Sequence, residues 1–294
     1  MKNKILVVIV TFNRLNELKK CIQSLRLQST KCFDILVVNN GGQDSTCNWL
    51  LDQNDLFCIN QDNVGGAGGF YVGMEYMMKN KYEWVVLMDD DGVADNTEIE
   101  NLIRVYPIVK ESFGGDVILN SLVVDIDNHL RTSFIWSRGS NRSDNVEKLK
   151  KELFFEDVHP FNGTLISRSV IEKIGLIKKE MFIWGDEKEY MARAKHHGIG
   201  LFTVTSALHY HPKEKGIKDN LIPMVPFIKI LVKPQRLSHY YYRNEGYIYW
   251  TYPHKRKKLI LFVLLQVVYN LSHLNMKEMM KFVVYFYKGM RNRY

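Results

Sequence analysis

Short apolar runs alternate with stretches of helical periodicity in the first part of the chain. Residues 4–10 and 34–38 are β-branched runs of the kind that form buried strands. The segment 14–27 between them repeats leucine and isoleucine at the spacing of one helix face. The chain therefore opens with a predicted strand, helix and strand.

The same alternation continues toward residue 88. It predicts strands at 57–59 and 84–88, with a glycine-rich turn at 65–69 and a helix over 70–80 between them. Buried strands that alternate with helices are typical of an α/β fold with an open, mostly parallel sheet covered by helices on both faces.

Beyond the first sheet elements the pattern is less regular. Residues 117–135 predict further strands, 163–167 a strand and 168–174 a helix, and an acidic segment at 185–190 opens a helix that runs to His197. The segment 137–152 is polar and charged without periodicity, which predicts a mobile loop.

The character of the sequence changes near residues 213–220, which divides a catalytic region at 1–213 from a helical region at 214–294. Two stretches in the second region, 255–270 and 276–294, combine bases with apolar residues. Such helices lie in the interfacial plane of an anionic membrane, or they pack as core or between two copies of the chain. The sequence leaves these alternatives open, so a homo-oligomer is one expectation.

Composition excludes a mainly disordered chain, because 46% of the 294 residues are hydrophobic and 24% are charged. The 40 basic residues exceed the 32 acidic ones, and much of the excess lies after residue 210. This suits an anionic surface such as phospholipid, or a nucleic acid. Of the two we expect the membrane surface and no nucleic acid partner. The cysteines form no C-x-x-C pair, which argues against a zinc or redox motif and predicts reduced thiols; they are Cys21, Cys32, Cys47 and Cys58.

The N-terminal segment 1–14 has a basic start and an apolar run but no small-residue cleavage site. We therefore interpret it as a first strand and not as a signal peptide. No run reaches the roughly 18 apolar residues that a spanning helix needs. These features predict a cytoplasmic protein, free or held at the inner face of the cell membrane.

An acidic triplet, Asp89, Asp90 and Asp91, follows the predicted strand at 84–88. Three neighbouring carboxylates repel one another unless a hard cation such as Mg²⁺ or Mn²⁺ neutralises them, and such a cation also bridges to a diphosphate. The alternative is a solvated acidic turn before the helix that begins near residues 95–97. The segments 11–13 and 39–40 also end predicted strands, so we expect all three to meet at the ligand-binding edge of the sheet.

Three further patterns are less specific. The glycines at 65–69 let a backbone approach a ligand and present helix N-terminal amides to an anion, or they form a flexible loop. Asp186 and Glu187 open a predicted helix, where they serve either the helix dipole or, beside an aromatic residue, as a general base. His209 and His211 share one face of an extended segment, which is weak support for a metal site.

Taken in order, these motifs resemble the GT-A glycosyltransferases of family 2, in the branch of galactofuranosyl- and rhamnosyltransferases. The resemblance covers about residues 1–212 and implies a GT-A nucleotide-binding sheet and an inverting mechanism. Its motifs are VVIVTFNR, VVNNGGQDST, NVGGAGGF followed by WVVLMDDDG, NGTLISRSVIEKIG and FIWGDEKEYMARAKHHG.

The resemblance also implies roles for single residues. Asp89 and Asp91 would hold the metal with His211, for which His209 is the fallback, and Glu187 would be the base, or Asp186 if the register shifts. The implied donor contacts are Thr11, Phe12, Arg14, Asn39, Asn63, Gly65, Gly66, Asp89 and Asp90. The implied acceptor contacts are Asn162, Gly163 and Trp184. Phe12 could instead be a core residue, and Asn39 a turn former.

The implied function is metal-dependent transfer of a sugar, with UDP-galactofuranose favoured as donor, onto a bacterial surface glycan such as capsule, O-antigen or cell-wall polysaccharide. The acceptor could be linked to a lipid. A rhamnosyltransferase that uses dTDP-rhamnose is the closest alternative. A non-catalytic protein that binds membrane or nucleic acid is the alternative from another class, and the intact metal motif and base argue against it.

Overall fold

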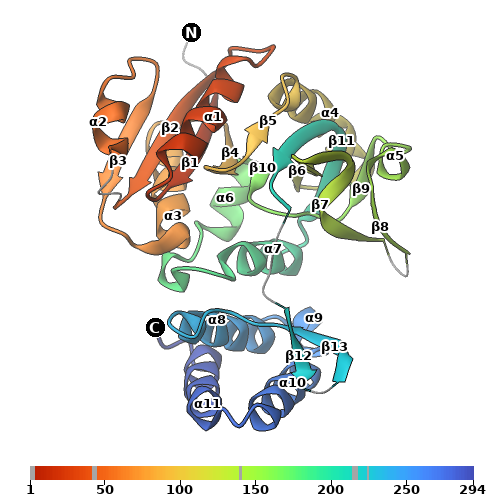
Figure 1. Cartoon of the computed structure of the whole chain (residues 1–294). Coiled ribbons are helices and arrows are strands. Elements are labelled where there is room, and N and C mark those ends of the chain that lie inside the picture. The colour runs from red at the N-terminus through yellow and green to blue at the C-terminus, as the bar shows by residue number, and fades with distance from the viewer. Residues whose placement is uncertain (1–3, 42–44, 139–140, 214–217, 224) are drawn as a thin grey trace. The chain divides into compact units, whose positions relative to one another are not determined.

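The computed structural model describes residues 4–41, 45–138, 141–213, 218–223 and 225–294 (Figure 1). The chain forms two compact units, of which the first contains Met1–Lys179 and His197–Glu214. The second contains Glu180–His196 and Lys215–Tyr294, so the segment with Asp186 and Glu187 belongs to the second unit. The functional division at residue 213 stays a prediction.

The first unit is built on one large mixed sheet whose main strand order is β3-β2-β1-β4-β10-β6-β11-β5. The first four strands of this order are mutually parallel, β10 runs antiparallel to both of its neighbours, and β11 is parallel to β6. Off this path β7 pairs with β6 and β8, and β9 pairs with β11. The strands are β1 (Ile5–Thr11), β2 (Phe33–Asn40), β3 (Phe57–Gln61), β4 (Trp84–Asp89), β5 (Val93–Ala94), β6 (Val117–Asp125), β7 (Asn128–Arg138), β8 (Asn141–Asn145), β9 (Phe154–Glu156), β10 (Asn162–Ser167) and β11 (Gly200–His211).

Helices cover both faces of this sheet, as the alternating pattern predicts (Figure 1). Val7 and Ile9 of β1 share a buried core with Leu18 and Ile22 of α1 and with Leu102 of α4. The intervening residues of β1 point the other way, toward α3. The helices of this unit are α1 (Leu15–Arg26), α2 (Thr46–Leu51), α3 (Gly65–Lys79), α4 (Glu98–Phe113), α5 (Val146–Leu149) and α6 (Arg168–Ile174).

The prediction of a glycine-rich turn over 65–69 is wrong, because these residues already form the start of α3. Two glycines of α3, Gly69 and Gly73, allow close packing. A Cβ on Gly69 would lie 2.4 Å from Val10 Cγ1, and a Cβ on Gly73 would lie 2.3 Å from Val8 Cγ1. The helix therefore lies directly against the Val8 and Val10 side chains of β1, a close approach that a larger residue at Gly69 or Gly73 would prevent.

The prediction of a mobile loop over 137–152 is also wrong for the part of that segment that the structure describes. β8 pairs with β7, and the short helix α5 follows it. Val146 and Leu149 of α5 are buried in a core cluster with Trp136 and Phe155. Two apolar residues anchor this otherwise polar segment, which is too few to give a detectable period.

The second unit is mainly helical, as predicted, with a core formed by Tyr242 and Tyr249 of α8 and Phe282 and Phe286 of α11. The helix α8 and the hairpin β12–β13 were not predicted. The elements are α7 (Asp186–His196), α8 (Ser238–Thr251), α9 (Pro253–Arg256), α10 (Leu259–Ser272), α11 (Met276–Met290), β12 (Lys218–Ile222) and β13 (Val225–Leu231), with a 3₁₀ turn η1 at Lys179–Met181. Among the described residues, none of the helices has the length and apolarity to cross a bilayer.

Candidate active site

Three strand ends meet at one edge of the sheet, as the sequence predicts. In the strand register Thr11 of β1 pairs with Asn39 of β2, and Val10 pairs with Asp89 of β4. The residues that follow β1 and β4 therefore lie side by side at the carboxyl ends of parallel strands, where ligands of such sheets bind.

Asp90 points into the protein and contacts the end of β1. The Thr11 hydroxyl donates to Asp90 Oδ2 at 2.7 Å, and Arg14 Nη1 lies 3.3 Å from Asp90 Oδ1. Only 4% of Asp90 is exposed. Burial raises the pKa of Asp90 to about 6, against the opposing effects of Thr11 and Arg14. The side chain thus connects two predicted donor-binding residues to the acidic turn.

Asp91 contacts the side chains of Arg14 and His211. Arg14 Nη1 lies 2.8 Å from Asp91 Oδ2, and His211 Nε2 lies 3.2 Å from Asp91 Oδ1. Burial would raise the pKa of Asp91, but His211 and Arg14 outweigh it and lower this pKa to about 2. Burial likewise acts to lower the pKa of His211, and Asp91 raises it above its usual value. Asp91 and His211 thus stabilise each other's charged forms.

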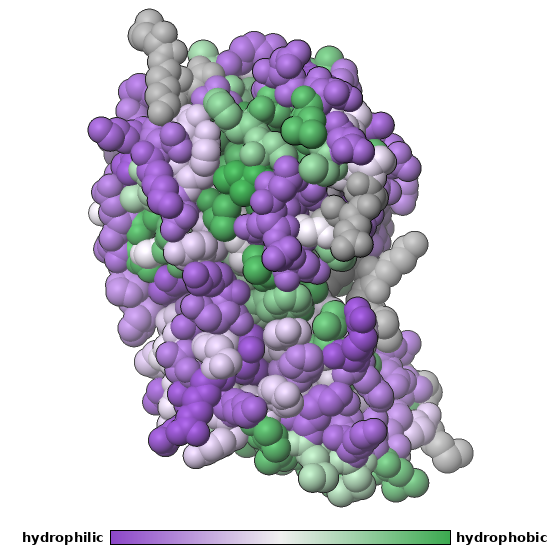
Figure 2. All heavy atoms as spheres, turned by 90° about the vertical axis from the view of Figure 1, so that its left-hand side faces the viewer, coloured by the Kyte–Doolittle hydropathy of each residue, from purple (hydrophilic) through white to green (hydrophobic). Residues whose placement is uncertain are grey.

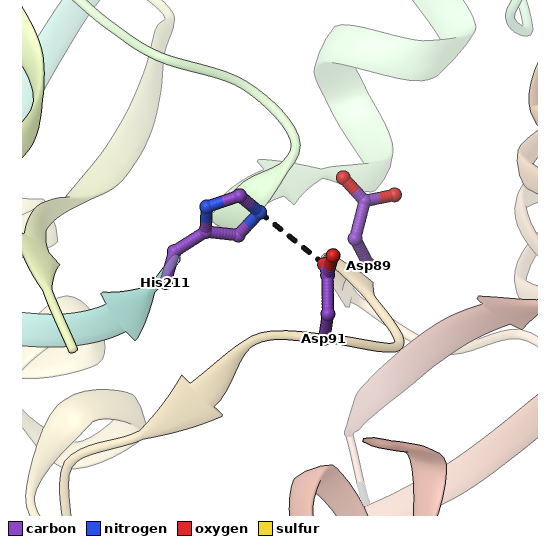
Figure 3. Close-up of side chains that lie close together, drawn as sticks. All are labelled: Asp89, Asp91 and His211. Carbon is purple, nitrogen blue, oxygen red and sulfur yellow. Dashed lines mark ion pairs between the residues drawn. The ribbon is translucent and has the colours of Figure 1, made fainter. Parts of the chain in front are cut away.

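Asp89, Asp91 and His211 form a group that could hold a metal ion. Each offers one ligand atom, and these atoms lie within 4.8 Å of one another (Figure 3). A six-coordinate Mg²⁺ or Mn²⁺ places opposite ligands roughly 4 Å apart, so small side-chain rotations would bring all three atoms around one cation. Two carboxylates and an imidazole are an ordinary donor set for a divalent ion. The residues present fit the predicted metal.

His209, the fallback ligand, lies outside this group. It is fully buried, and its Nδ1 lies 3.1 Å and 3.2 Å from the two carboxylate oxygens of Glu98. The Ser121 hydroxyl donates to Glu98 Oε1 at 2.6 Å. The structure therefore brings His211, and not His209, to the aspartates, and assigns His209 to a buried network that fixes β11.

Of the predicted acceptor residues in the first unit, Gly163 packs against the same network. Its φ is +66°, and a Cβ at this position would lie 1.9 Å from Glu98 Oε1. Asn162 is buried and donates from Nδ2 to the His159 carbonyl at 3.3 Å, whereas its Oδ1 has no hydrogen-bond partner within the part of the chain that the structure describes. Their contacts with an acceptor stay predictions.

On the donor side the side chains of Asn39 and Asn63 make local contacts. Asn39 Nδ2 donates to Asn60 Oδ1 at 2.8 Å, and Asn63 Oδ1 accepts from the backbone N–H of Gly65 at 2.9 Å. Gly65 opens α3, and the next residue, Gly66, faces open space. Phe12 is 44% exposed, so the alternative that it is a core residue is wrong.

Sequence reasoning missed Asn40, which holds the start of α3 in place. Its Nδ2 donates to the Gly65 carbonyl at 2.9 Å, and its Oδ1 accepts from Gln61 Nε2 at 2.9 Å and from the Val64 N–H at 3.3 Å. The signal was the pair of asparagines at the end of β2, of which only the first received a role.

In the second unit, Trp184, Asp186 and Glu187 lie at the entry to α7. Glu187 is half-buried and its Oε2 accepts from the Gly185 N–H at 3.2 Å, whereas Asp186 is buried. Trp184 has a φ of +58°, a left-handed conformation that is uncommon for a bulky residue. This backbone therefore needs support from its surroundings.

That support comes from Arg243 and Asn244 of α8, which were not predicted as site residues. Asn244 Nδ2 donates to the carbonyls of Met181, Ile183 and Trp184 at 2.9, 3.1 and 3.0 Å. Arg243 Nη2 donates to the Glu180 carbonyl at 2.6 Å. In the sequence, the only sign of this role is the adjacent Arg and Asn within an aromatic run. That these two residues support the backbone before α7 follows from the fold.

Comparison with known proteins decides the family. The model of Glycosyl transferase family 2 matches residues 6–175, more than half of the chain. The chain belongs to this family. The match confirms the family that the motifs predict, and it makes the protein a glycosyltransferase.

The family-2 chain is similar to two characterised kinds of transferase. It is 30% identical over 220 residues to galactofuranosyltransferase GlfT1 of Mycobacterium tuberculosis, covering 72% of this chain and 71% of the relative. It is 26% identical over 202 residues to dTDP-rhamnosyl transferase RfbF of Shigella flexneri, covering 68% and 66%. The predicted branch of the family is thereby confirmed.

The fold of this family-2 protein is also found in a solved structure, that of S. aureus TarS 1-349 in complex with UDP-GlcNAc. The TM-score is 0.56 at 14% identity, covering 98% of this chain and 81% of that chain. This likeness confirms the predicted GT-A-type fold class.

Proposed function

We propose that the protein is an inverting, metal-dependent galactofuranosyltransferase that transfers galactofuranose from UDP-galactofuranose to a hydroxyl of a bacterial surface glycan. The observation that carries the proposal is the convergence of Asp89, Asp91 and His211 at the carboxyl edge of the sheet. The similarity to a galactofuranosyltransferase over most of the chain supports the choice of sugar.

Asp89, Asp91 and His211 would hold the cation, Mg²⁺ or Mn²⁺. When bound, such a cation neutralises the diphosphate and stabilises the charge that develops on the departing nucleoside diphosphate. An imidazole among the ligands favours Mn²⁺ over Mg²⁺, because Mg²⁺ prefers oxygen ligands.

Arg14 is proposed as the second group for the diphosphate. Its Nη1 makes the contacts with both Asp90 and Asp91 and thereby fixes the guanidinium at the strand edge. The remaining N–H groups of the guanidinium are proposed to donate to phosphate oxygens. Asp90 accepts a hydrogen bond from Thr11 and contacts Arg14. We propose that it thereby orients Arg14 beside the nucleotide sugar.

Phe12 and the backbone at Asn63–Gly66 complete the proposed donor site. The exposed ring of Phe12 offers a flat apolar surface to a nucleobase. The N-terminus of α3 presents backbone amides with a favourable dipole for the donor, and Asn40 and Asn63 fix its geometry.

Glu187 is proposed as the general base that takes the proton from the acceptor hydroxyl, which then attacks the anomeric carbon in a single displacement. Its half-buried carboxylate is more accessible than that of Asp186. Trp184 next to it is proposed to contact the acceptor sugar through its ring, with Asn162 and Gly163 as further acceptor contacts.

Release of nucleotide from two donors tests the proposal. The protein would be incubated with UDP-galactofuranose or dTDP-rhamnose, each with Mn²⁺, with Mg²⁺ and with EDTA, and free nucleotide would be measured. We expect metal-dependent release of UDP and little release of dTDP. Release from dTDP-rhamnose alone would make the protein a rhamnosyltransferase, the function that similarity to RfbF favours as second candidate. Full release in EDTA would contradict the metal role.

A further inference from the structure

The helix α10 carries an apolar stripe that the second unit leaves uncovered. At the roughly 100° per residue of an α-helix, the members of this stripe fall within about 100° of arc on one side. The opposite side of α10 packs into the core of the unit, where Phe262, Val263 and Val267 contact the buried aromatic cluster. The exposed stripe consists of Ile260, Leu261, Leu264, Val268 and Leu271.

The helix α11 carries a matching stripe. Its inward side holds Phe282 and Phe286, and its outward side is apolar again over a similar arc. Leu274 in the turn between the two helices is 87% exposed. The exposed residues of α11 are Met276, Met280, Val283, Val284 and Tyr287.

Together these eleven side chains form what we call the α10–α11 face. Figure 2 shows apolar side chains along the lower edge of the second unit, where Figure 1 draws these two helices. Eleven exposed apolar side chains gathered on two neighbouring helices and the turn between them are more than the scattered apolar residues of an ordinary surface, and they mark an interaction site. Ordinary packing within the unit does not account for it, since both helices already bury their other sides.

The charge of the protein is concentrated in the same segment. Residues 253–294 contain nine Lys and Arg and one acidic residue, Glu278, a net charge of +8 that equals the net charge of the whole chain. Residues 1–252 contain 31 basic and 31 acidic residues and are neutral overall. Glu278 is buried and paired with Lys281, so no acidic side chain of this segment is exposed beside the bases.

The bases lie next to the apolar stripes. Lys257 and Lys258 directly precede α10 and are exposed. On α11, Lys277 and Lys288 are exposed and fall on one flank of the stripe, near Val284. An apolar face bordered by bases is the arrangement by which helices lie in the headgroup region of an anionic bilayer.

We infer that the α10–α11 face is a membrane-binding surface that inserts its apolar stripes into an anionic phospholipid monolayer while Lys257, Lys258, Lys277 and Lys288 contact the lipid phosphates. A second copy of the chain fits this face less well, because pairing two such faces would bring two segments of net charge +8 together. The inference does not depend on the proposed donor, since membrane binding is measured without any sugar nucleotide.

Co-sedimentation of the intact protein with lipid vesicles tests the inference. One set of vesicles contains phosphatidylcholine alone, and the other contains equal parts of phosphatidylcholine and phosphatidylglycerol. We expect binding to the second set, and binding that is at least about tenfold weaker to the first. The Leu264→Glu/Val283→Glu variant and the Lys257→Glu/Lys258→Glu variant should each bind the anionic vesicles roughly tenfold or more weakly than the parent.

Matched controls come from the first unit. Leu51 is 71% exposed, and Lys150 and Lys151 are neighbouring exposed bases. Leu51→Glu and Lys150→Glu/Lys151→Glu should bind vesicles like the parent, and all variants should keep the parent's urea midpoint because the altered side chains are exposed.

Four outcomes would overturn the inference. The first is no binding of the parent to anionic vesicles, and the second is equal loss in the control variants. The third is a dimer in light scattering that Leu264→Glu/Val283→Glu dissociates while vesicle binding is absent, which would make the face an interface between copies. Binding to duplex DNA in place of vesicles would likewise reassign the bases to a nucleic acid.

Discussion

His211 Nε2 lies 3.2 Å from Asp91 Oδ1, which joins the last residue of β11 to the turn after β4. The strand β11 pairs with β5 just after that turn, so the sheet itself delivers the imidazole to the aspartate. Asp89 completes the group. Two elements far apart in the sequence thus bring the three side chains of the candidate cation site together only when the sheet has folded.

The first prediction concerns metal affinity. Asp91→Asn and His211→Ala should each weaken Mn²⁺ binding by at least about 100-fold, because each removes one of three protein ligands. Calorimetric titration with Mn²⁺ measures this directly, without a sugar donor. Asp52→Asn is the matched control, since Asp52 is exposed and lies outside the group. Unchanged affinity in both site variants would contradict the assignment.

The second prediction separates the base from the donor site. Glu187→Gln should lower kcat by about 10²–10⁴-fold while the Kd for UDP stays the same, because the amide keeps the shape but cannot accept the proton. Steady-state transfer assays measure kcat, and a titration with UDP measures the Kd. If Asp186→Asn abolishes transfer and Glu187→Gln does not, the base is Asp186.

The third prediction contrasts two glycines of α3. Gly73→Ala should destabilise the protein by about 1–3 kcal/mol, because the new Cβ would clash with Val8. Gly66→Ala should be neutral or stabilising by up to about 1 kcal/mol, since a Cβ there meets nothing within 4 Å. Urea unfolding of both variants checks the contrast. Equal effects would mean that α3 does not pack on β1 as described.

The fourth prediction concerns Asn244. Asn244→Ala removes the side-chain donor to the carbonyls of Ile183 and Trp184, and one of several donors to that of Met181. It should therefore cost about 2–4 kcal/mol of stability and reduce transfer by altering the backbone around Trp184. Asn270→Ala is the control, because the Nδ2 of this buried asparagine donates to a carbonyl of its own helix, that of Gln266. Asn270→Ala should lower the free energy of unfolding by less than Asn244→Ala does, and it should leave kcat unchanged. Normal transfer by folded Asn244→Ala would refute the positioning role.

Much of the first unit could be predicted because its strands β1, β2 and β4 are buried along most of their length and give continuous apolar runs. The three strand ends with Thr11, Asn39 and Asp89 follow from that pattern, since parallel strands place their carboxyl ends at one edge. The glycine segment 65–69 was predicted at the correct edge of the sheet, but as a turn and not as the start of the helix α3. Glycine has low helix propensity, and only contact with Val8 and Val10 shows why it lies within a helix.

The remaining parts depend on long-range contacts that no local pattern encodes. The choice between His209 and His211 required knowing that Glu98 is the partner of His209. The supporting role of Asn244 required the packing of α8 beside the entry to α7. The helices α10 and α11 were predicted from composition, but which of their sides is exposed follows only from the position of the aromatic core.

The most direct test of the central claim is a crystal structure of the protein soaked with UDP and Mn²⁺. The account predicts one Mn²⁺ ion bound by Asp89, Asp91 and His211, with both phosphates of UDP at that ion and Arg14 beside them. A diphosphate bound elsewhere, or an ion that leaves His211 paired with Asp91 alone, would contradict it.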